Sequence, residues 1–390
     1  MHKPERLLFA KENDPSLPTI IYFCCVHGNE KASYHALNQT FKQLEKSEIQ
    51  LKGNVYVILG NREAFVQEVR FIDKDLNRIW TKSHMASALD GKLASEYNEL
   101  LELYETLYYI LNRSTSEIIA IDLHTTSAPT KPFIIMNDAL NNRDFVRQLG
   151  YPVIFNVETY IVGTLLNLMN DLGHTSIAFE GGEHYAEEAV EEIKKFCFKT
   201  LFHAELISRS DVEKLSLPKD YIQLKSSSYY EMVFRQNLEP NDQFQMKSGF
   251  SNFQALKKGE EVATLNNMRI TAPKSARIFM PLYQAKGEDG FFFIKEISSI
   301  KLKVARYLRN LEAERVLCLL PGIKKLNHYT IGVPKSIDKF IPQRFLFALG
   351  YRKSVETSGK FLYTKQERKL TQLPKIKQFK SPYIDMEYEN

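Results

Sequence analysis

Residues 19–30, TIIYFCCVHGNE, place an apolar run directly before a short polar segment. The apolar part is rich in β-branched and aromatic residues, which favours a β-strand buried on both faces. The polar part contains His27 and Glu30 in a His-x-x-Glu spacing. Because open α/β sheets carry their ligand sites at the carboxyl ends of parallel strands, the stretch predicts a sheet strand with a candidate site at its end.

Similar apolar runs recur toward residue 210 and alternate with helical patterns. The predicted strands are 54–59, 118–123, 132–136, 152–156 and 175–180. Two helices are predicted over 92–112 and 186–206. The stripe of the first helix consists of Leu93, Tyr97, Leu100, Leu101, Tyr104, Leu107, Tyr108 and Leu111. Alternating strands and helices predict an α/β domain with a mixed, mostly parallel sheet flanked by helices.

The sequence pattern changes after Leu217-Pro218, where short runs are separated by Gly and Asn turns without long helices between them. These runs are 229–234, 261–265, 268–272, 276–280 and 291–296. They predict a small all-β domain, followed by a helix over about 300–316 and short elements. We therefore expect a catalytic domain (1–215), a β-rich domain (216–300) and a basic C-terminal extension (301–390).

Charge is unevenly distributed along the 390 residues, whose net charge is +5. Residues 301–390 hold 19 Lys or Arg and 8 Asp or Glu, a net of +11, whereas residues 1–300 hold 33 and 39, a net of −6. A basic segment can bind nucleic acid or an acidic partner, but it is more often a solvated face. No zinc-finger spacing or RNP-type motif is present, so the sequence does not indicate a nucleic-acid-binding protein.

Composition places the chain among ordinary globular proteins, with 44% hydrophobic and 25% charged residues. No uninterrupted apolar stretch approaches the length of a transmembrane helix, and the N-terminus lacks the pattern of a signal peptide. The four cysteines, Cys24, Cys25, Cys197 and Cys318, form no C-x-x-C pair, so we expect buried reduced thiols. These features predict a cytoplasmic protein without a membrane partner, and they leave a homo-oligomer open.

Further polar residues follow other predicted strands. His124 comes at the end of the run 118–123, and Glu180 ends the run 175–180. His-x-x-Glu with a distant histidine is the composition of a catalytic zinc site with three protein ligands, for which a nearby glutamate would act as general base. Each residue alone has a simpler interpretation, because a histidine after a strand commonly faces solvent or caps an element.

A second polar cluster lies in an aromatic stretch at 60–80. Arg70, Asn77 and Arg78 offer a bidentate clamp for a substrate carboxylate, although Asp75-Leu76-Asn77-Arg78 would also suit the start of a helix with surface charges. Asp122 precedes His124 by two residues and shares its strand face. It is either a partner that orients the imidazole or a buried structural carboxylate.

Four motifs in this order, CCVHGNE, DKDLNRIW, IDLHTT and AFEGGEH, resemble the aspartoacylase and succinylglutamate desuccinylase family, a branch of the zinc carboxypeptidase superfamily. The segment 259–293 is similar to the β domain of that family, which packs beside the active site. The resemblance covers most of residues 19–300 and implies a zinc-carboxypeptidase-like fold. The segment after residue 300 has no counterpart in it.

The resemblance implies a role for each matching residue. One zinc ion per chain would be held by His27, Glu30 and His124, with Glu180 as general base. Arg70 would polarise the scissile carbonyl, while Asn77, Arg78 and, more loosely, Tyr283 would bind substrate. The family has a further substrate-binding arginine about ten residues before the catalytic glutamate, but residues 165–180, LLNLMNDLGHTSIAFE, contain none.

The function expected from these features is hydrolysis of the amide bond of an N-acyl amino acid to a carboxylic acid and a free amino acid. Because the expected arginine is missing, the acyl group does not follow from the resemblance. Two alternatives remain open. A zinc carboxypeptidase acting on a peptide terminus would share the metal site, and a non-catalytic protein would use the same pocket only to bind a ligand.

Overall fold

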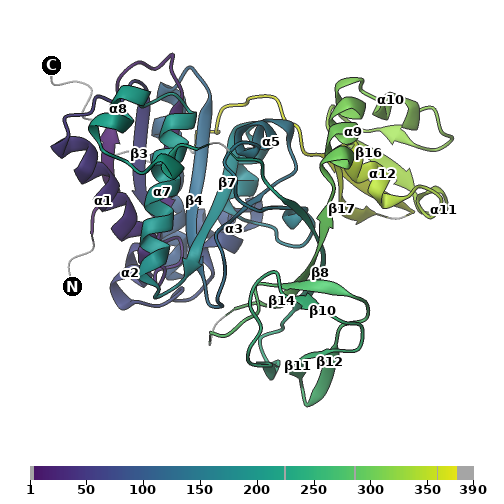
Figure 1. Cartoon of the computed structure of the whole chain (residues 1–390). Helices are drawn as coiled ribbons and strands as arrows, with labels where there is room; N and C mark the ends of the chain where they lie inside the picture. The colour runs from purple at the N-terminus through teal and green to yellow at the C-terminus, as the bar shows by residue number, and fades with distance from the viewer. Residues whose placement is uncertain (1–3, 224, 285–286, 358, 376–390) are drawn as a thin grey trace. The chain divides into compact units, whose positions relative to one another are not determined.

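A computed structural model describes the chain over residues 4–223, 225–284, 287–357 and 359–375. The chain forms two compact units, each assembled from separate stretches of sequence (Figure 1). Of the described residues, unit 1 contains 4–125, 163–223 and 370–375. Unit 2 contains residues 126–162 and 224–369. The divisions at residues 215 and 300 stay predictions.

A mostly parallel sheet forms the centre of unit 1, with the strand order β1-β3-β2-β4-β7. Its strands are β1 (Leu7–Lys11), β2 (Thr19–Cys24), β3 (Asn54–Leu59), β4 (Ile118–Thr126) and β7 (Thr175–Glu183). β2 pairs in parallel with both β3 and β4, whereas the edge strand β1 is antiparallel to β3. The sheet confirms the predicted α/β fold class.

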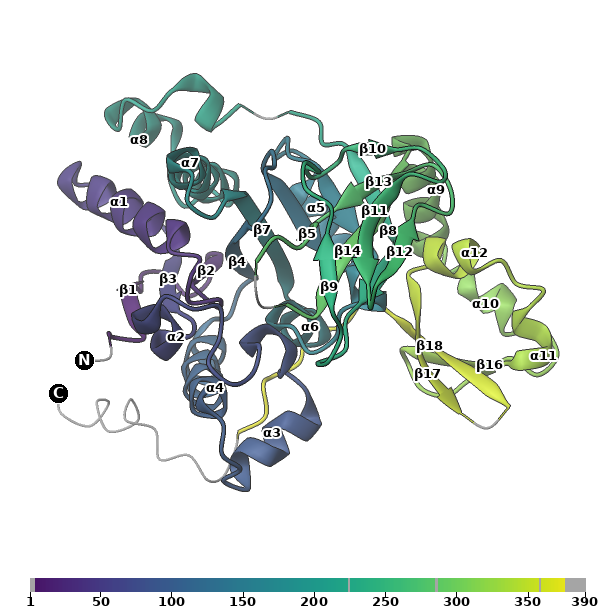
Figure 2. The ribbon, with the colours of Figure 1, turned by 90° about the horizontal axis from the view of Figure 1, so that it is seen from below.

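Helices cover both faces of this sheet, with α1 (Ala32–Lys46) and α7 (Glu187–His203) on one side and α4 (Ser95–Arg113) and α6 (Leu165–Asp171) on the other (Figure 2). Successive side chains of β2 point to opposite faces of the sheet, so the strand contacts the helices on both sides. The Tyr22 hydroxyl lies 2.7 Å from Thr200 Oγ1 of α7, whereas Phe23 packs in the core that contains Leu100 of α4. The shorter helices of unit 1 are α2 (Arg62–Gln67), η1 (Leu76–Arg78), α3 (Lys82–Leu89), α8 (Arg209–Lys214) and η3 (Lys219–Tyr221).

The buried face of α4 differs in detail from the predicted stripe. Leu93 lies before the helix and is 99% exposed, so its assignment to the stripe is wrong. Leu103 and Ile110, which the prediction omits, are buried in the core. The helix turns 100° per residue, and a stripe wide enough to cover a sheet takes in positions that a narrower pattern leaves out.

Unit 2 contains the strand order β5-β6-β8-β14-β13-β10 and a separate three-stranded antiparallel sheet, β12-β11-β9. β5, β6 and β8 run parallel, and the strands from β8 onward pair antiparallel. The bounds are β5 (Phe133–Met136), β6 (Val153–Phe155), β8 (Tyr229–Asn237), β9 (Phe244–Met246), β10 (Ala255–Leu256), β11 (Glu261–Leu265), β12 (Met268–Thr271), β13 (Ala276–Phe279) and β14 (Asp289–Ile297). The predicted all-β character of this segment is confirmed. Two helices of this unit, α5 (Leu140–Val146) and η2 (Val157–Thr159), come from its first stretch.

Residues from 299 to 365 add a small α/β module to unit 2. A four-stranded antiparallel sheet, in the order β15-β16-β18-β17, has its own buried core that includes Ile331, Leu346 and Tyr363. Its elements are α9 (Ser299–Asn310), α10 (Glu314–Leu317), β15 (Lys324–Lys325), β16 (Thr330–Pro334), α11 (Lys335–Asp338), α12 (Gln343–Ala348), β17 (Tyr351–Thr357) and β18 (Lys360–Lys365). The described part of the basic extension is therefore folded, and a sheet that the sequence did not predict organises it.

The structure bears on the expectations about membrane-spanning helices and about the cysteines. Within the described residues, no helix has both the length and the apolar character that crossing a membrane requires. The four cysteines are free, and three of them are buried, whereas Cys318 is only half-buried.

Buried ion pairs join the C-terminal module to the first stretch of unit 2. Asp138 Oδ2 lies 2.7 Å from Arg309 Nη2 and 2.8 Å from Arg352 Nη2, and Arg143 pairs with the other carboxylate oxygen. Burial alone would raise the pKa of Asp138, but the three guanidinium groups hold it well below its usual range. Arg309 also pairs with Glu367 at 2.7 Å. The network fixes α9 and β17 to the segment that precedes α5.

We expect Arg309→Met to destabilise the fold by about 3–5 kcal/mol, because it removes one of the three cations around the buried Asp138 and breaks the ion pair with Glu367. The matched control is Arg306→Met on the same helix, which removes an exposed pair with Asp144 and should cost about 1 kcal/mol or less. Chemical denaturation of both variants, followed by circular dichroism, measures the difference. Equal losses would contradict a central role for Arg309.

Candidate metal centre and active site

The turn after β2 brings His27 and Glu30 to the same side of the chain. The backbone N–H of Glu30 donates to the carbonyl of His27 at 3.1 Å. Gly28 has no room for a side chain, because a Cβ there would lie 2.1 Å from the backbone of Ala64. The N–H of Gly28 donates to the carbonyl of Arg70 at 3.1 Å. The motif is therefore a tight turn held against α2 and against the loop that carries Arg70.

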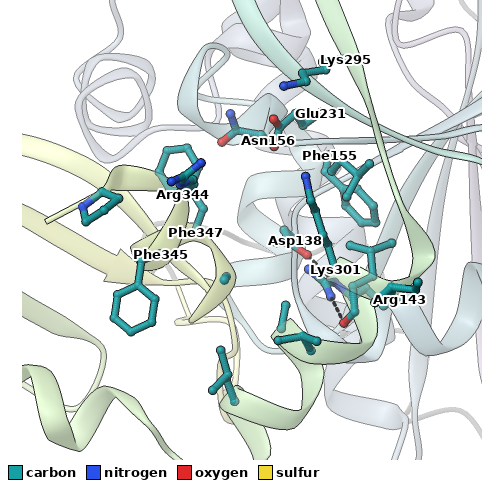
Figure 3. A pocket seen from close by; sticks show the side chains of 18 of the residues that line it. Asp138, Arg143, Phe155, Asn156, Glu231, Lys295, Lys301, Arg344, Phe345 and Phe347 are labelled. Atoms are coloured by element: carbon teal, nitrogen blue, oxygen red, sulfur yellow. Dashed lines mark hydrogen bonds and ion pairs between the residues drawn. The ribbon is translucent and has the colours of Figure 1, made fainter.

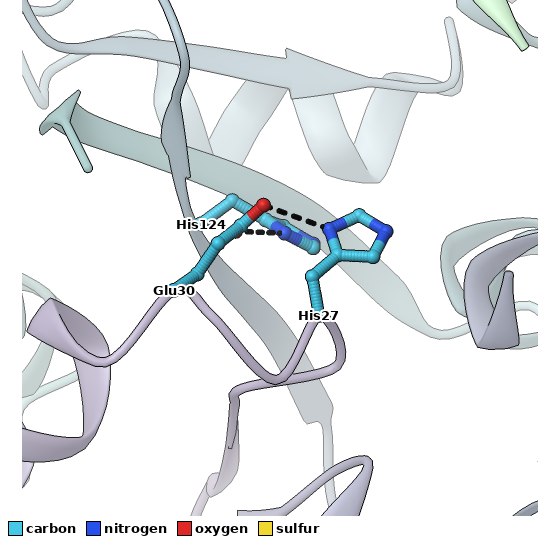
Figure 4. Close-up of side chains that lie close together, drawn as sticks. All are labelled: His27, Glu30 and His124. Carbon is cyan, nitrogen blue, oxygen red and sulfur yellow. Dashed lines mark hydrogen bonds and ion pairs between the residues drawn. The ribbon is translucent and has the colours of Figure 1, made fainter. Parts of the chain in front are cut away.

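His27, Glu30 and His124 form a compact group of metal donors (Figure 4). One donor atom from each residue lies within 4.8 Å of the others, and all three side chains are buried. Glu30 Oε1 is 2.9 Å from His27 Nδ1, and Glu30 Oε2 is 2.8 Å from His124 Nδ1. Two imidazole nitrogens and one carboxylate thus converge, as the sequence predicted.

The outer nitrogens of both imidazoles contact aspartates. Asp75 Oδ1 lies 3.1 Å from His27 Nε2, and Asp122 Oδ2 lies 2.7 Å from His124 Nε2. An aspartate that accepts a hydrogen bond from one ring nitrogen leaves the lone pair of the other free for a metal and fixes the ring orientation. Asp122 therefore acts as the orienting partner, which was one of the two readings that the sequence left open.

Electrostatic coupling inside the group is strong. Burial would raise the pKa of Glu30, but the imidazoles of His27 and His124 and their hydrogen bonds hold it well below its usual range. Burial would lower the pKa of His124, but the carboxylates of Asp122 and Glu30 raise it well above its usual range. The lowered pKa of Glu30 and the raised pKa of His124 have the same cause, since positive charge between these side chains is stabilised.

The charge balance around the donors fits a divalent cation. Four buried carboxyl groups are opposed by two guanidinium groups, and the imidazoles can remain neutral. With both imidazoles neutral, as metal binding requires, and all four carboxyls ionised, the group carries a charge of −2, which is costly to bury without compensation. A Zn²⁺ ion would neutralise it, and two imidazoles with one carboxylate are suitable ligands for that ion. The carboxyl groups belong to Glu30, Asp75, Asp122 and Glu180, and the guanidinium groups to Arg70 and Arg78.

The loop between α2 and η1 adds cations beside the donors. Arg70 Nη2 pairs with Asp75 Oδ2 at 3.1 Å, and Arg70 Nη1 lies 3.5 Å from Glu30 Oε1. Burial would raise the pKa of Asp75, but His27, Arg70 and Arg78 hold it well below its usual range. Asp75 also caps η1 by accepting from the N–H of Asn77. A short 3₁₀ helix does begin here, but the buried Asp75 and Asn77 contradict the alternative of surface charges.

The amide of Asn77 is engaged at both ends. Its Nδ2 donates to Asp122 Oδ2 at 3.2 Å and lies 3.4 Å from His124 Nε2, and its Oδ1 accepts from the N–H of Leu165 at 3.0 Å. This geometry supports a role in holding the pair of Asp122 and His124. The predicted contact of Asn77 with substrate stays a prediction, as does that of Arg78, which donates to the carbonyl of Asn77.

Glu96, to which the sequence interpretation gave no role, anchors the same loop from helix α4. Its fully buried carboxylate accepts from the backbone N–H groups of Ile72, Asp73 and Lys74 at 2.6, 3.0 and 2.9 Å. It also accepts from Asn61 Nδ2 at 3.0 Å. Three successive amides bound by one carboxylate fix the path of the backbone that presents Arg70 and Asp75. The helical stripe carried no signal for this, because Glu96 lies beside it among ordinary polar positions.

Glu180 lies on β7, the strand next to β4, which carries His124. Its side chain is buried, and its Oε2 has no hydrogen-bond partner within the described part of the chain. Burial raises the pKa of Glu180 to about 8, with His124 and Arg70 opposing the rise and Glu30 adding to it. A buried carboxyl group with an open oxygen and a pKa near neutrality is suited to proton transfer.

Tyr283 belongs to unit 2. Its hydroxyl donates to the carbonyl of Lys247 and accepts from the N–H of Phe250, both at 2.9 Å. These bonds fix the ring within the β-rich segment. A contact of Tyr283 with substrate stays a prediction.

Residues 16–200 match the family model of the succinylglutamate desuccinylase/aspartoacylase catalytic domain. The match contains the three donors, the loop with Arg70 and Asp75, and Glu180. This segment belongs to that family. The resemblance carried by the four sequence motifs is therefore confirmed for the catalytic domain of the desuccinylase and aspartoacylase type.

Curated relatives of this family align with parts of the chain. The succinylglutamate desuccinylase of Shewanella denitrificans is 32% identical over 114 residues, which are 29% of this chain and 32% of that protein. The succinylglutamate desuccinylase of Shewanella pealeana is 25% identical over 258 residues, which are 63% of this chain and 72% of that protein. The chain thus spans about a third of the length of the first of these relatives.

Two solved structures share the fold. The succinylglutamate desuccinylase of Vibrio parahaemolyticus superposes with a TM-score of 0.54 at 16% identity, over 74% of this chain and 84% of that chain. Murine aminoacylase 3 gives a TM-score of 0.52 at 14% identity, over 73% of this chain and 97% of that chain. At these identities the likeness shows the fold alone.

We expect the purified chain to bind one zinc ion and His27→Ala to lose it, because two donors do not close a stable site. Asp122→Asn should keep the site but weaken zinc affinity by about 10- to 100-fold, since the imidazole of His124 loses its anionic partner. Elemental analysis and chelator competition measure both effects, with the exposed Asp144→Asn as control. Stoichiometric zinc in His27→Ala would disprove the ligand assignment.

Proposed function

We propose that this protein is a zinc-dependent hydrolase that cleaves the amide bond of an N-acyl amino acid and releases a carboxylic acid and a free amino acid. The observation that carries the proposal is the buried set of His27, Glu30 and His124 with Glu180 on the neighbouring strand. These residues lie in the segment that belongs to the desuccinylase and aspartoacylase family.

Zinc held by the three donors would supply a Lewis acid for the carbonyl oxygen and would lower the pKa of a coordinated water. Glu180 is proposed to accept a proton from the attacking water, through the carboxylate oxygen that has no hydrogen-bond partner among the described residues. The same carboxyl group then gives this proton to the leaving nitrogen. Its raised pKa suits both steps, because a group that titrates near the working pH can take and return a proton.

Arg70 is proposed to stabilise the negative charge that develops on the carbonyl oxygen. Its guanidinium is already fixed beside the donors by Asp75 and Glu30, so little reorganisation is needed when the charge appears. A preorganised donor of this kind is typically worth about 3–4 kcal/mol in the transition state. Glu96 contributes indirectly, because it holds the backbone from which Arg70 and Asp75 project.

The proposed substrate class is supported by the names of the relatives, which state desuccinylation of succinylglutamate and acylase activity. We assign Arg78 and Asn77 to the carboxylate of the amino acid portion, with Tyr283 as a further candidate. The acyl group is left to a substrate screen, because residues 165–179 contain no arginine for a second carboxylate. The four free cysteines fit a reducing compartment, and we propose the cytoplasm.

Glu180→Gln should bind zinc and fold normally but lose hydrolysis by about 10²- to 10⁴-fold, because the amide cannot accept the proton. The measurement is amine release from a panel of N-acyl amino acids, with zinc content and circular dichroism recorded for the same samples. Turnover near that of the unmodified chain would remove Glu180 from the mechanism. Zinc binding without hydrolysis of any panel member by the unmodified chain would favour a binding protein instead.

Arg78→Lys should raise KM for the best substrate more than it lowers kcat, because a single ammonium reproduces a bidentate carboxylate grip poorly. Arg209→Lys, at an exposed position of α8, is the matched control and should change neither constant. The carboxylate contact is refuted if the unmodified enzyme hydrolyses substrates with an amidated carboxyl end equally well.

A further inference from the structure

Unit 2 contains a cavity of about 690 Å³ that the hydrolase proposal does not use (Figure 3). It is lined by α9 and α12 of the C-terminal module, by the end of β14, and by residues near β6, β8 and α5. Ligand sites of proteins commonly have volumes of about 300–1,000 Å³, so this cavity has the size of a small-molecule site. Most of its lining lies beyond the family match over 16–200.

The walls of the cavity are largely apolar. α9 contributes Ile300, Val304 and Leu308, and the opposite walls contribute Phe155 and Phe347. Ile300 and Val304 remain 70% and 52% exposed, although α9 directs them to the cavity along one helical stripe. A ligand that covers these exposed apolar side chains removes their surface from water, which favours binding.

The deep charges of the cavity are already neutralised by protein partners. Arg143 pairs with Asp138, donates to the carbonyl of Leu302, and lies over the ring of Phe155. Arg352 pairs with Asp138 at 2.8 Å and with Glu158 at 2.9 Å. These guanidinium groups therefore shape the wall but are not available to an incoming anion.

The other charged side chains that line the cavity have a net charge of +1. Lys295, Lys301 and Arg344 line the cavity together with the carboxylates of Glu231 and Glu296. In the described parts of the chain, none of these three cations forms an ion pair. Lys301 and Arg344 extend from different walls, α9 and α12, into the space that Figure 3 shows. Three cations against two carboxylates suit a ligand with a single negative charge better than a dianion or a cation.

We propose that this cavity binds a small amphipathic monocarboxylate, with its apolar body against Ile300, Val304 and Phe347 and its carboxylate between Lys301 and Arg344. Arg344 can contact a carboxylate with two N–H groups, and Lys301 adds a second charged donor. The site is separate from the zinc donors, since every residue that lines it belongs to unit 2. The inference does not depend on the proposed hydrolysis.

Isothermal titration of the full chain with octanoate tests the proposal. We expect saturable binding, and we expect the double substitution Lys301→Glu with Arg344→Glu to weaken it by about tenfold or more, because two charge-assisted bonds are lost. The matched control is Lys303→Glu with Lys339→Glu, which changes the net charge equally at exposed positions outside the cavity and should leave binding intact. Circular dichroism verifies the fold of both variants.

A second variant and two further probes test the apolar wall and the charge assignment. Val304→Asp should weaken octanoate binding, whereas Tyr307→Asp, at an exposed position on α9 outside the lining, should not. Octylamine should bind more weakly than octanoate, and so should octyl phosphate at a pH where it is a dianion. Equal binding of octylamine, tighter binding of octyl phosphate, absent octanoate binding, or unchanged binding in the double variant would each overturn the proposal.

Discussion

The cluster of carboxyl groups buried toward the carboxyl ends of β2, β4 and β7 is the constraint on which the site depends. Glu30, Asp122 and Glu180 are drawn together by the sheet, and Asp75 reaches the same group from the loop before η1. Carboxylates so close repel each other unless positive charge lies among them. Two arginines lie among these carboxylates, and both imidazoles are oriented by them. A divalent cation would complete the compensation of their charge.

Much of the fold was predictable because its signals are local. Buried parallel strands are continuous apolar runs, and the polar residue that follows each run lies at the sheet edge where ligands bind. His27, Glu30 and His124 were therefore identified from two short segments, and the structure brings their donor atoms together. The β-rich segment was recognisable from its spaced turns. The family motifs strengthened these assignments but did not replace them.

Other features depend on tertiary contacts that no local pattern encodes. Glu96 occupies a helix surface position in the sequence, yet its carboxylate binds three backbone amides of a loop more than twenty residues earlier. Asp75 was visible only as one of several charges, and its contact with His27 depends on how that loop folds. The C-terminal sheet was missed because β15 has two residues, β16 contains a glycine and a proline, and β17 has neither a continuous apolar run nor a strict alternation of polar and apolar residues.

The C-terminal module illustrates how buried charge can specify an arrangement. Its α9 and β17 carry Arg309 and Arg352, and both converge on Asp138, which lies more than 170 residues earlier. Separating these groups would leave buried charge without compensation, so the cluster disfavours arrangements in which they are not paired. The same geometry holds α9 at the cavity and commits Arg143 and Arg352 to the protein. Only the outer cations then remain for a ligand, so the network that orders the module also determines the charge its cavity accepts.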